Sequence, residues 1–209
     1  FIKTDAKIVK YADDVVIIFP VSPDVSNLNE NLRRMQNMLN EVVEFYSDNG
    51  LKLNSNKSTY MCIGKPKMEG LEFMLNSAGY LKNDRLKYLG LSIDYELKMD
   101  SYVSELTTKV TQAIGVIYNI RNKLPVSVLM NFYFGHIHSH LSYCSFVLLR
   151  CNQAEILRLQ RLQNRSLKLI HRLPVEHPTI DLFETYANNV LPVVGLIYFS
   201  ALMMIKKCE

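Results

Sequence analysis

The segment that decides the fold is Tyr11-Ala12-Asp13-Asp14, which lies between the apolar runs Ile8-Val9 and Val15–Phe19. Apolar, β-branched runs on both sides of a short polar break predict two strands joined by a tight turn. Two adjacent carboxylates repel each other, and a turn can be built from residues that cost less. A divalent cation removes this cost, because Mg²⁺ prefers carboxylate and carbonyl oxygens. The pattern indicates a metal-binding turn, although a lone Asp-Asp pair in a hairpin is more often simply solvated.

The composition is that of a globular protein with a sizeable core. The chain has 209 residues, of which 48% are hydrophobic and 21% charged, enough for one or two domains. It begins with Phe1 and shows no secretory signal pattern, so we expect an internal piece of a longer polypeptide. Cys62, Cys144, Cys151 and Cys208 form no CxxC pair, which favours reduced thiols in an intracellular protein over disulfides or a zinc site.

The charges are unevenly distributed along the chain. Residues 1–100 contain 13 Lys and Arg against 14 Asp and Glu, whereas residues 101–175 contain nine against two. Residues 176–209 have a net negative charge, with two Lys and Arg against four Asp and Glu. A basic second half of this kind indicates a polyanionic partner.

The first hundred residues predict one helix among short strands. Apolar residues at helical spacing predict a helix over Asn27–Ser47, with Ser26 as N-cap and Asn49-Gly50 as its end. Runs of β-branched, aromatic and other apolar residues predict short strands at Thr59–Ile63, Leu71–Leu75 and Leu86–Ile93. Turns are expected at Gly64-Lys65-Pro66 and at Asn76–Gly79.

The remainder predicts long helices. Three are expected, at Tyr102–Lys123, Ser127–Leu149 and Gln153–Leu173, separated by Pro125, Cys151-Asn152 and Pro174. The apolar stretch Val190–Ile205 is too short and too interrupted for a membrane span, and it predicts a buried helix. The expected fold class is α+β, with a small antiparallel sheet and one helix in residues 1–99 and a helical domain in residues 100–209.

Several motifs resemble those of reverse transcriptases, and they occur in the family's order. The strand-flanked Tyr11-Ala12-Asp13-Asp14 resembles motif C of the polymerase palm. Leu51-Lys52-Leu53-Asn54 followed by Lys57-Ser58 is similar to motif D. The segment Arg85–Leu91 resembles motif E, and Leu162–Ile170 is similar to a stretch of the thumb-side helices. The combination resembles a non-LTR (LINE-type) retrotransposon reverse transcriptase of the Jockey or CR1 kind over nearly the whole chain.

This resemblance implies an RNA-directed DNA polymerase that transfers nucleotides with two Mg²⁺ ions, or Mn²⁺ in their place. Asp13 and Asp14 would be metal ligands, Asp13 the more direct, and Tyr11 would lie below the primer terminus. Lys57 would lie near the triphosphate and protonate pyrophosphate, and a solvated loop lysine is an equal alternative. Gly90 allows close approach of another backbone, and the order of the motifs favours the primer grip over an ordinary strand glycine.

The resemblance places residues 1–99 in the palm and residues 100–209 in the thumb. The partners would be an RNA template, a DNA primer and deoxynucleoside triphosphates, with no membrane, in the nucleus and cytoplasm. The primer-binding residues would be Tyr11, Tyr88, Leu89 and Gly90.

The family's motifs A and B and its fingers precede motif C, and nothing in Phe1–Lys10 can replace them; Asp5 is too close to Tyr11. We therefore expect the missing N-terminal palm and fingers in the same polypeptide, and the 209-residue chain alone to be inactive. The alternative is a degenerate or domesticated nucleic-acid-binding module without catalysis.

A row of basic residues in the last long helix indicates nucleic-acid binding independently of the resemblance. At about 100° per residue the five fall within an arc of roughly 80°. They are Arg158, Arg161, Arg165, Lys168 and Arg172. A solvated helix face usually mixes Glu with Lys, whereas no acidic residue follows Glu155 here, so phosphate contacts are favoured.

Three closely spaced histidines are also candidate metal ligands. His136 and His140 would share one helix face, whereas His138 would point elsewhere. Since no carboxylate or cysteine lies nearby in sequence, helix packing is favoured over zinc binding.

Overall fold

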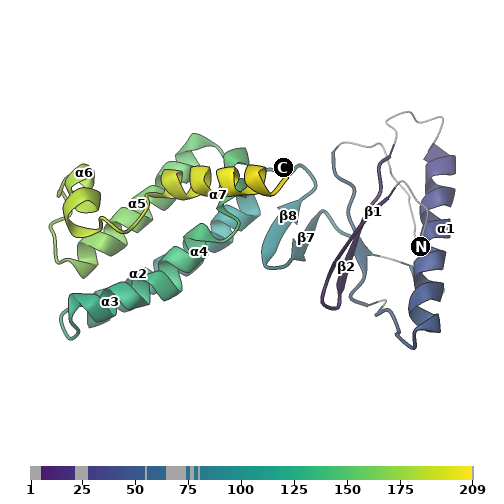
Figure 1. Ribbon diagram of the computed structural model, residues 1–209, viewed down its shortest axis with the longest axis horizontal. Coiled ribbons are helices and arrows are strands. Elements are labelled where there is room, and N and C mark those ends of the chain that lie inside the picture. Colours follow the sequence, from purple (N-terminus) through teal and green to yellow (C-terminus); the bar gives the residue numbers. More distant parts are fainter. Residues whose placement is uncertain are drawn as a thin grey trace. The chain divides into compact units, whose positions relative to one another are not determined.

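The structure is a computed structural model, and it describes residues 6–21, 28–54, 56–64, 74–75, 78–79 and 81–208 (Figure 1). Its contacts divide the chain into two compact units, Phe1–Leu86 and Lys87–Glu209. The first contains short strands and one helix, and the second is mainly helical. The predicted α+β fold class is confirmed. The assignment of residues 1–99 to a palm and 100–209 to a thumb stays a prediction.

The first unit begins with the hairpin predicted from its sequence. Strand β1 (Lys7–Tyr11) pairs with β2 (Asp14–Ile18) in antiparallel register, with Tyr11 opposite Asp14. The connection is two residues long, and its first residue, Ala12, has a φ of 52°. Two-residue hairpins favour such a left-handed first position, because it matches the twist of the strands. The strain of Ala in this conformation is thus tied to the tightness of the turn.

Helix α1 (Leu28–Asp48) confirms the helix predicted over Asn27–Ser47. Met38 and Val42 are buried on one face, as its apolar spacing requires. The helix ends in a Schellman motif, since Leu51 N–H donates to Tyr46 O at 2.8 Å and Gly50 N–H to Ser47 O at 2.9 Å. Gly50 has the φ of +70° that this end needs. The predicted N-cap Ser26 lies outside the described residues.

The remaining described strands of this unit are only two residues long. They are β3 (Thr59–Tyr60), β4 (Met74–Leu75), β5 (Ala78–Gly79) and β6 (Leu81–Lys82). β4 pairs antiparallel with β5, whereas β3 and β6 pair in parallel.

Three expectations need correction here. The strand predicted over Thr59–Ile63 stops at Tyr60, and Ala78–Gly79, predicted as a turn, is a strand. The pairing of β3 with β6 is parallel, not antiparallel as expected. Pairing partners, which are set by tertiary structure, decide these short strands more than local propensity does. Of the strand predicted over Leu71–Leu75, residues 71–73 lie outside the described part.

A second hairpin, β7 (Arg85–Tyr88) and β8 (Leu91–Asp94), leads into the helical unit. The single strand predicted over Leu86–Ile93 is divided by a turn at Leu89-Gly90, where both residues have a positive φ. After it, the buried carboxylate of Asp94 organises the link to α2 (Asp100–Ile120). Its Oδ1 accepts from the main-chain N–H groups of Glu96 and Lys98, both at 3.0 Å, and its Oδ2 accepts from that of Met99 at 3.2 Å. Since Met99 has a φ of 63°, these bonds hold a turn that the backbone alone disfavours.

The helical unit contains α3 (Val126–Tyr133), α4 (Ser139–Ser142), α5 (Gln153–Ile170), the short α6 (Thr179–Asp181) and α7 (Val193–Cys208). A π-helical turn, Phe134–His138, joins α3 to α4, and another, Leu182–Tyr186, follows α6. Residues Ser145–Arg150 form a 3₁₀ helix. Apolar side chains from α2, α3, α5 and α7 make one core, which includes Val110, Ile117, Leu129, Leu159 and Val193.

One buried amide joins three of these helices. The side chain of Gln163 on α5 donates from Nε2 to Tyr133 Oη at 3.0 Å and to Leu191 O at 2.9 Å. Its Oε1 accepts from Val193 N–H at 3.0 Å and from Gln160 Nε2 at 3.0 Å. All four hydrogen-bonding positions of the amide are therefore used, as a fully buried amide requires. Burial also raises the pKa of Tyr133 to about 12.

Two predicted helices differ in extent from those observed. The helix predicted over Ser127–Leu149 breaks at Tyr143-Cys144, where Cys144 has a φ of 49°. The one predicted over Gln153–Leu173 ends at Ile170. Neither end is marked by glycine or proline at the break itself, so the local sequence gave no signal for it.

The apolar stretch Val190–Ile205 is helical from Val193 onward, but the prediction that it is buried holds only for its first part. Val193, Leu196 and Ile197 are buried, whereas Tyr198 and Leu202 are 61% and 65% exposed. The reason is that the core reaches only the first half of α7. Among the described residues, no helix combines the length and apolar character that a bilayer crossing needs.

Replacing Asp94 by Ala removes the acceptor of three main-chain N–H groups, so we expect the free energy of unfolding to fall by about 2 kcal/mol. Asp94→Asn should lose less, because one oxygen remains an acceptor. Urea unfolding followed by circular dichroism measures the change. As a control, Glu176→Ala at an exposed site should change the unfolding free energy by less than about 0.5 kcal/mol. Equal losses in Asp94→Ala and Glu176→Ala would contradict the capping role.

Candidate active site and nucleic-acid interface

The first candidate site is the turn between β1 and β2. Asp13 is the second residue of the two-residue turn, and Asp14 is the first residue of β2. Both carboxylates are exposed, and Tyr11 beside them is 63% exposed. Lys10 lies in the same hairpin, with its Nζ 5.7 Å from the centre of the Tyr46 ring on α1, a cation–π contact that links hairpin to helix. The turn therefore exposes to solvent the carboxylates of two residues that are adjacent in sequence.

Asp13 and Asp14 fit a divalent cation as part of a ligand set. Mg²⁺ needs six oxygen ligands and in proteins is usually held by one or two carboxylates together with water or substrate phosphates. In the described ranges, no group of three or more His, Cys, Asp or Glu side chains lies close enough to hold a metal ion. The pair can therefore supply two ligands, and the rest must come from solvent, substrate or other residues.

Lys57, the motif D-like lysine, is exposed on a compact turn of the same unit. Asn54 organises this turn: its main-chain oxygen accepts from the N–H groups of Lys57 and Ser58, both at 3.1 Å, and from Ser58 Oγ at 2.8 Å. Asn54 Oδ1 also accepts from Asn56 N–H at 3.1 Å. The turn fixes the main chain at Lys57 and leaves its ammonium in solvent. This geometry suits a triphosphate contact and a solvated lysine equally.

The second candidate site is the tip of the β7–β8 hairpin. Leu89 and Gly90 form a two-residue turn with φ values of 47° and 83°. Two consecutive left-handed residues are the signature of a type I′ turn, which explains the glycine and leaves Leu89 strained. Tyr88 is half-buried at the end of β7, whereas Leu89 is 37% exposed. The tip is therefore a tight turn at which Leu89 and Gly90 are accessible.

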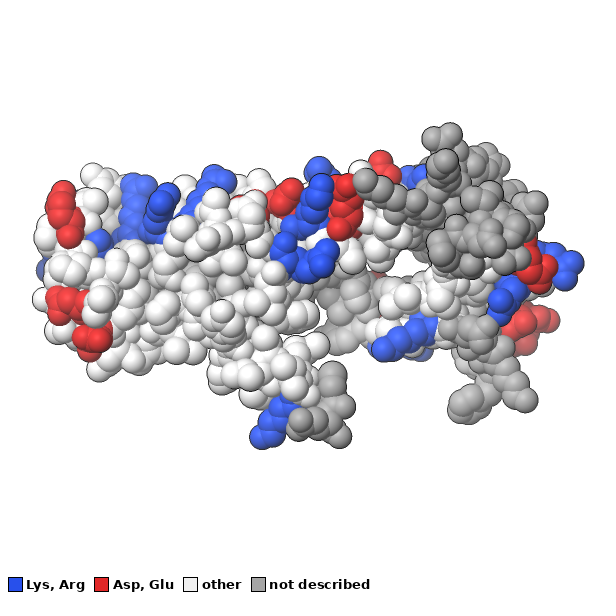
Figure 2. All heavy atoms as spheres, turned by 90° about the horizontal axis from the view of Figure 1, so that it is seen from above, with Lys and Arg blue, Asp and Glu red and all other residues white. Residues whose placement is uncertain are grey.

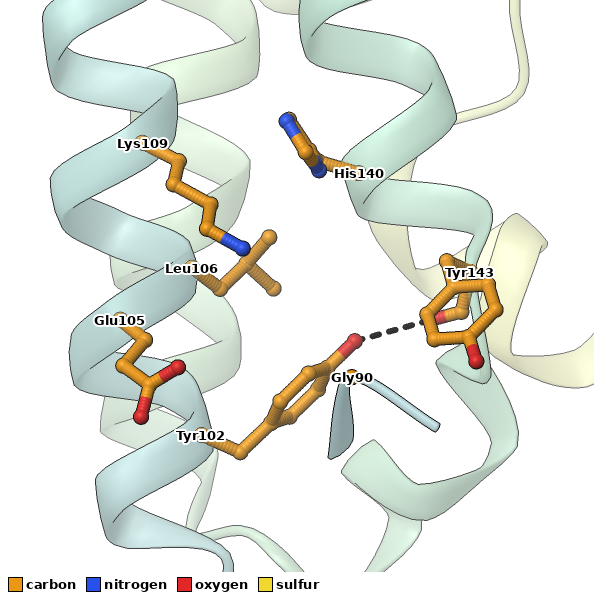
Figure 3. Close-up of a pocket in the computed structure, with 7 residues that line it drawn as sticks. All are labelled: Gly90, Tyr102, Glu105, Leu106, Lys109, His140 and Tyr143. Carbon is orange, nitrogen blue, oxygen red and sulfur yellow. Dashed lines mark hydrogen bonds between the residues drawn. The ribbon is translucent and has the colours of Figure 1, made fainter. Parts of the chain in front are cut away.

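A small hollow lies beside this tip within the helical unit (Figure 3). It is lined by Gly90 of the hairpin, by residues of α2 and by residues at the end of α4, namely Tyr102, Glu105, Leu106, Lys109, His140 and Tyr143. Tyr102 Oη donates to Tyr143 O at 2.8 Å, and the hydroxyl of Tyr143 donates to Leu89 O. Sequence reasoning missed both tyrosines, because their partners are 41 and 54 residues away in the chain.

Glu105, which lines the hollow, forms a hydrogen bond and an ion pair with residues of the hairpin. Ser92 Oγ donates to Glu105 Oε1 at 2.6 Å, and Lys87 Nζ lies 3.4 Å from Glu105 Oε2. The hydrogen bond from Ser92, and then the charge of Lys87, hold the pKa of Glu105 below its usual value. Burial, with the nearby charge of Lys109, lowers the pKa of His140, which favours its neutral form at pH 7. Glu105 thus ties α2 to the hairpin.

The basic row on α5 divides into two parts. Arg158, Arg161 and Arg165 are exposed and lie opposite the buried face of the helix. Lys168 is half-buried and its Nζ donates to Val175 O at 2.6 Å.

Arg172 lies beyond the end of α5 and donates from Nη2 to Arg121 O at 3.1 Å and to Leu124 O at 3.4 Å. Lys168 and Arg172 therefore stabilise loops at the end of the helix. On the face of the helical unit that Figure 2 shows, the Lys and Arg side chains lie in separate groups.

The three histidines of the region after α3 pack against neighbours. The His136 ring centre lies 4.4 Å from that of Phe132, and the His138 ring centre lies 5.3 Å from that of Phe134. Burial lowers the pKa of His138. His140 lines the hollow described above. The contacts of these rings are those of helix packing.

Comparison with known proteins gives one match. Residues 1–93 match the family model of the reverse transcriptase (RNA-dependent DNA polymerase). No curated protein and no solved structure matches the chain significantly. The matched range contains Asp13, Asp14, Lys57 and the tip of the β7–β8 hairpin. It supports reverse transcriptase parentage and a function related to RNA-directed DNA polymerases.

We expect the exposed arginines of α5, among them Arg161 and Arg165, to contact phosphate, and Lys168 not to. Replacing both arginines by Gln should weaken binding of an RNA–DNA hybrid and flatten the slope of log K against log salt by about 1.4 to 1.8, since each lost contact removes about 0.7 to 0.9. Fluorescence anisotropy over a salt series measures the slope. Lys168→Gln is the matched comparison and should leave the slope nearly unchanged while lowering stability. An unchanged slope in the folded double variant would show that the row is an ordinary solvated face.

Proposed function

We propose that this chain is the part of a non-LTR retrotransposon reverse transcriptase that runs from motif C of the palm through the thumb. In the intact polypeptide it would copy RNA into DNA. The observation that supports this most directly is the Tyr11–Asp14 hairpin, whose exposed adjacent carboxylates occupy a tight turn inside the range that matches reverse transcriptases. The order of the D-like and E-like motifs after it supports the non-LTR branch.

Asp13 and Asp14 would hold the divalent ions. Two such ions, when bound, lower the pKa of the primer 3′-hydroxyl and neutralise charge on the α-phosphate and on the departing pyrophosphate. The protein's own part is to orient these groups. Tyr11 would support the primer terminus from the strand beside the carboxylates, and its exposure leaves it accessible for that contact.

Lys57 would serve the leaving group. The hydrogen bonds to Asn54 fix the main chain at Lys57. Its exposed side chain can then extend from this turn to a triphosphate. A lysine in such a place can stabilise pyrophosphate and donate a proton to it.

The β7–β8 tip would hold the primer strand through Tyr88, Leu89 and Gly90. The glycine adds no side chain, so a sugar–phosphate backbone can approach the turn closely. The exposed arginines of α5 would hold the duplex by contacts to phosphate that depend little on sequence.

In a polypeptide that contains the whole polymerase region, Asp13→Asn should lower Mg²⁺-dependent primer extension by at least about 100-fold, because an amide is a much weaker ligand than a carboxylate. Affinity for the primer–template duplex should change little. Single-turnover extension and anisotropy measure the two quantities. Asp48→Asn, at an exposed position on α1, is the matched control and should extend normally. Extension by Asp13→Asn at the rate of the unmodified enzyme would contradict the two-metal assignment.

The 209-residue chain by itself should not extend a primer. Its Asp13–Asp14 pair has no third acidic partner in the described part of the chain, so the metal ligands would be incomplete. The assay supplies primer, RNA template, Mg²⁺ and deoxynucleoside triphosphates and looks for longer products on a sequencing gel. A templated product would show that this chain contains a complete active site, contrary to the prediction. Duplex binding without extension, even in the intact polypeptide, would instead favour a binding module that has lost catalysis.

A further inference from the structure

The helix that follows α3 ends abruptly at Tyr143-Cys144, and the break is costly. Tyr143 is extended, with φ and ψ of −64° and 120°, and Cys144 is left-handed, with φ and ψ of 49° and 30°. A residue with a β-carbon loses roughly 1 to 2 kcal/mol in that conformation. Such strain persists only where surrounding contacts hold it, and it often occurs next to functional elements. The contacts around Tyr143 therefore show what holds this conformation in place.

Hydrogen bonds fix Tyr143-Cys144 from both sides. On one side Tyr102 Oη, from α2, donates to Tyr143 O at 2.8 Å. On the other side the buried Ser145 Oγ donates to Leu196 O of α7 at 3.0 Å. Figure 3 shows Tyr102 extending from α2 to the main chain of Tyr143. The turn is thus anchored to α2 and α7, two of the helices that contribute to the core of this unit.

The anchored turn directs the Tyr143 side chain to the tip of the β7–β8 hairpin. Its hydroxyl donates to Leu89 O. Its ring carbon Cε1 lies 3.9 Å from the position that a β-carbon on Gly90 would occupy. The peptide between Leu89 and Gly90 lies in the middle of the strained turn, and its orientation is the one that a type I′ turn can most easily change. A hydrogen bond to its carbonyl oxygen fixes that orientation.

We propose that Tyr143, supported by Tyr102, positions the Leu89–Gly90 tip so that it presents a fixed surface to the primer strand. Tyr143 acts through the hairpin and needs no contact with the primer. The inference rests on the proposed role of the tip in holding the primer. The hydrogen bond from Tyr143 to Leu89 O, which we call the tether, is independent of that role. Because a misplacement of about 1 Å at a reacting centre can reduce a rate about 100-fold, loosening the tip should affect extension more than affinity.

The tether is tested first on the 209-residue chain by hydrogen exchange. Tyr143→Phe removes one oxygen and keeps the ring, so the amide protons of Gly90 and Leu91 should exchange about three- to tenfold faster, while those of α5 keep their rates. Tyr198→Phe removes the hydroxyl of an exposed tyrosine on α7 and should change neither set. Tyr102→Phe should act in the same direction, and the two replacements together should be less than additive because they act on one chain of bonds. Unchanged exchange at the tip in Tyr143→Phe would overturn the tether.

The consequence for the primer is tested in the polypeptide that contains the whole polymerase region. Tyr143→Phe should reduce the single-turnover extension rate about tenfold and change the dissociation constant of a primer–template duplex less than about twofold. A general loss of structure would instead alter both quantities together. Faster exchange at the tip with normal extension would overturn the positioning role. If the unmodified protein binds the duplex but does not extend it, the proposed function fails, and the exchange result still decides the tether.

Discussion

The helical unit depends on the buried amide of Gln163. Its side chain joins α5 to Tyr133 of α3 and to the main chain at Leu191 and Val193, where α7 begins. An amide buried without partners would cost several kcal/mol, so arrangements of these helices that leave its positions unsatisfied are disfavoured. The apolar core around it supplies most of the stabilisation, and the amide makes the packing specific.

Helix α7 is in turn connected to the tip of the β7–β8 hairpin through a series of hydrogen bonds. Leu196 O on α7 accepts from Ser145, which follows the strained Tyr143-Cys144 turn. That turn directs Tyr143 to Leu89 in the β7–β8 hairpin. Hydrogen bonds therefore link the packing of the helices to the geometry of the β7–β8 tip, to which we assign the primer contact. The matched residues 1–93 end within β8, so this support comes from beyond the matched range.

The basic residues in and just after α5 illustrate how hydrogen bonds to the main chain separate residues that look alike in sequence. All five lie at helical spacing, but Lys168 and Arg172 donate to main-chain oxygens of neighbouring loops. Those bonds stabilise the end of α5, where Arg172 itself has a φ of 57°. Arg158, Arg161 and Arg165 keep exposed side chains, which makes them the better candidates for phosphate contacts.

The sequence by itself determined the elements whose signals are local. The β1–β2 hairpin and helix α1 were predicted from apolar periodicity and turn residues, and the adjacent carboxylates indicated Asp13 and Asp14 as candidates. Lys57 became a candidate through the resemblance of its motif to that of reverse transcriptases, and Gly90 through such a resemblance together with the close backbone approach that a glycine allows. Only the tertiary structure decided the break at Tyr143, the parallel pairing of β3 with β6 and the exposure of the second half of α7. The physical reason is that these features depend on partners far away in the chain. A helix pattern cannot show that a tyrosine will leave the helix to bond a carbonyl 54 residues earlier.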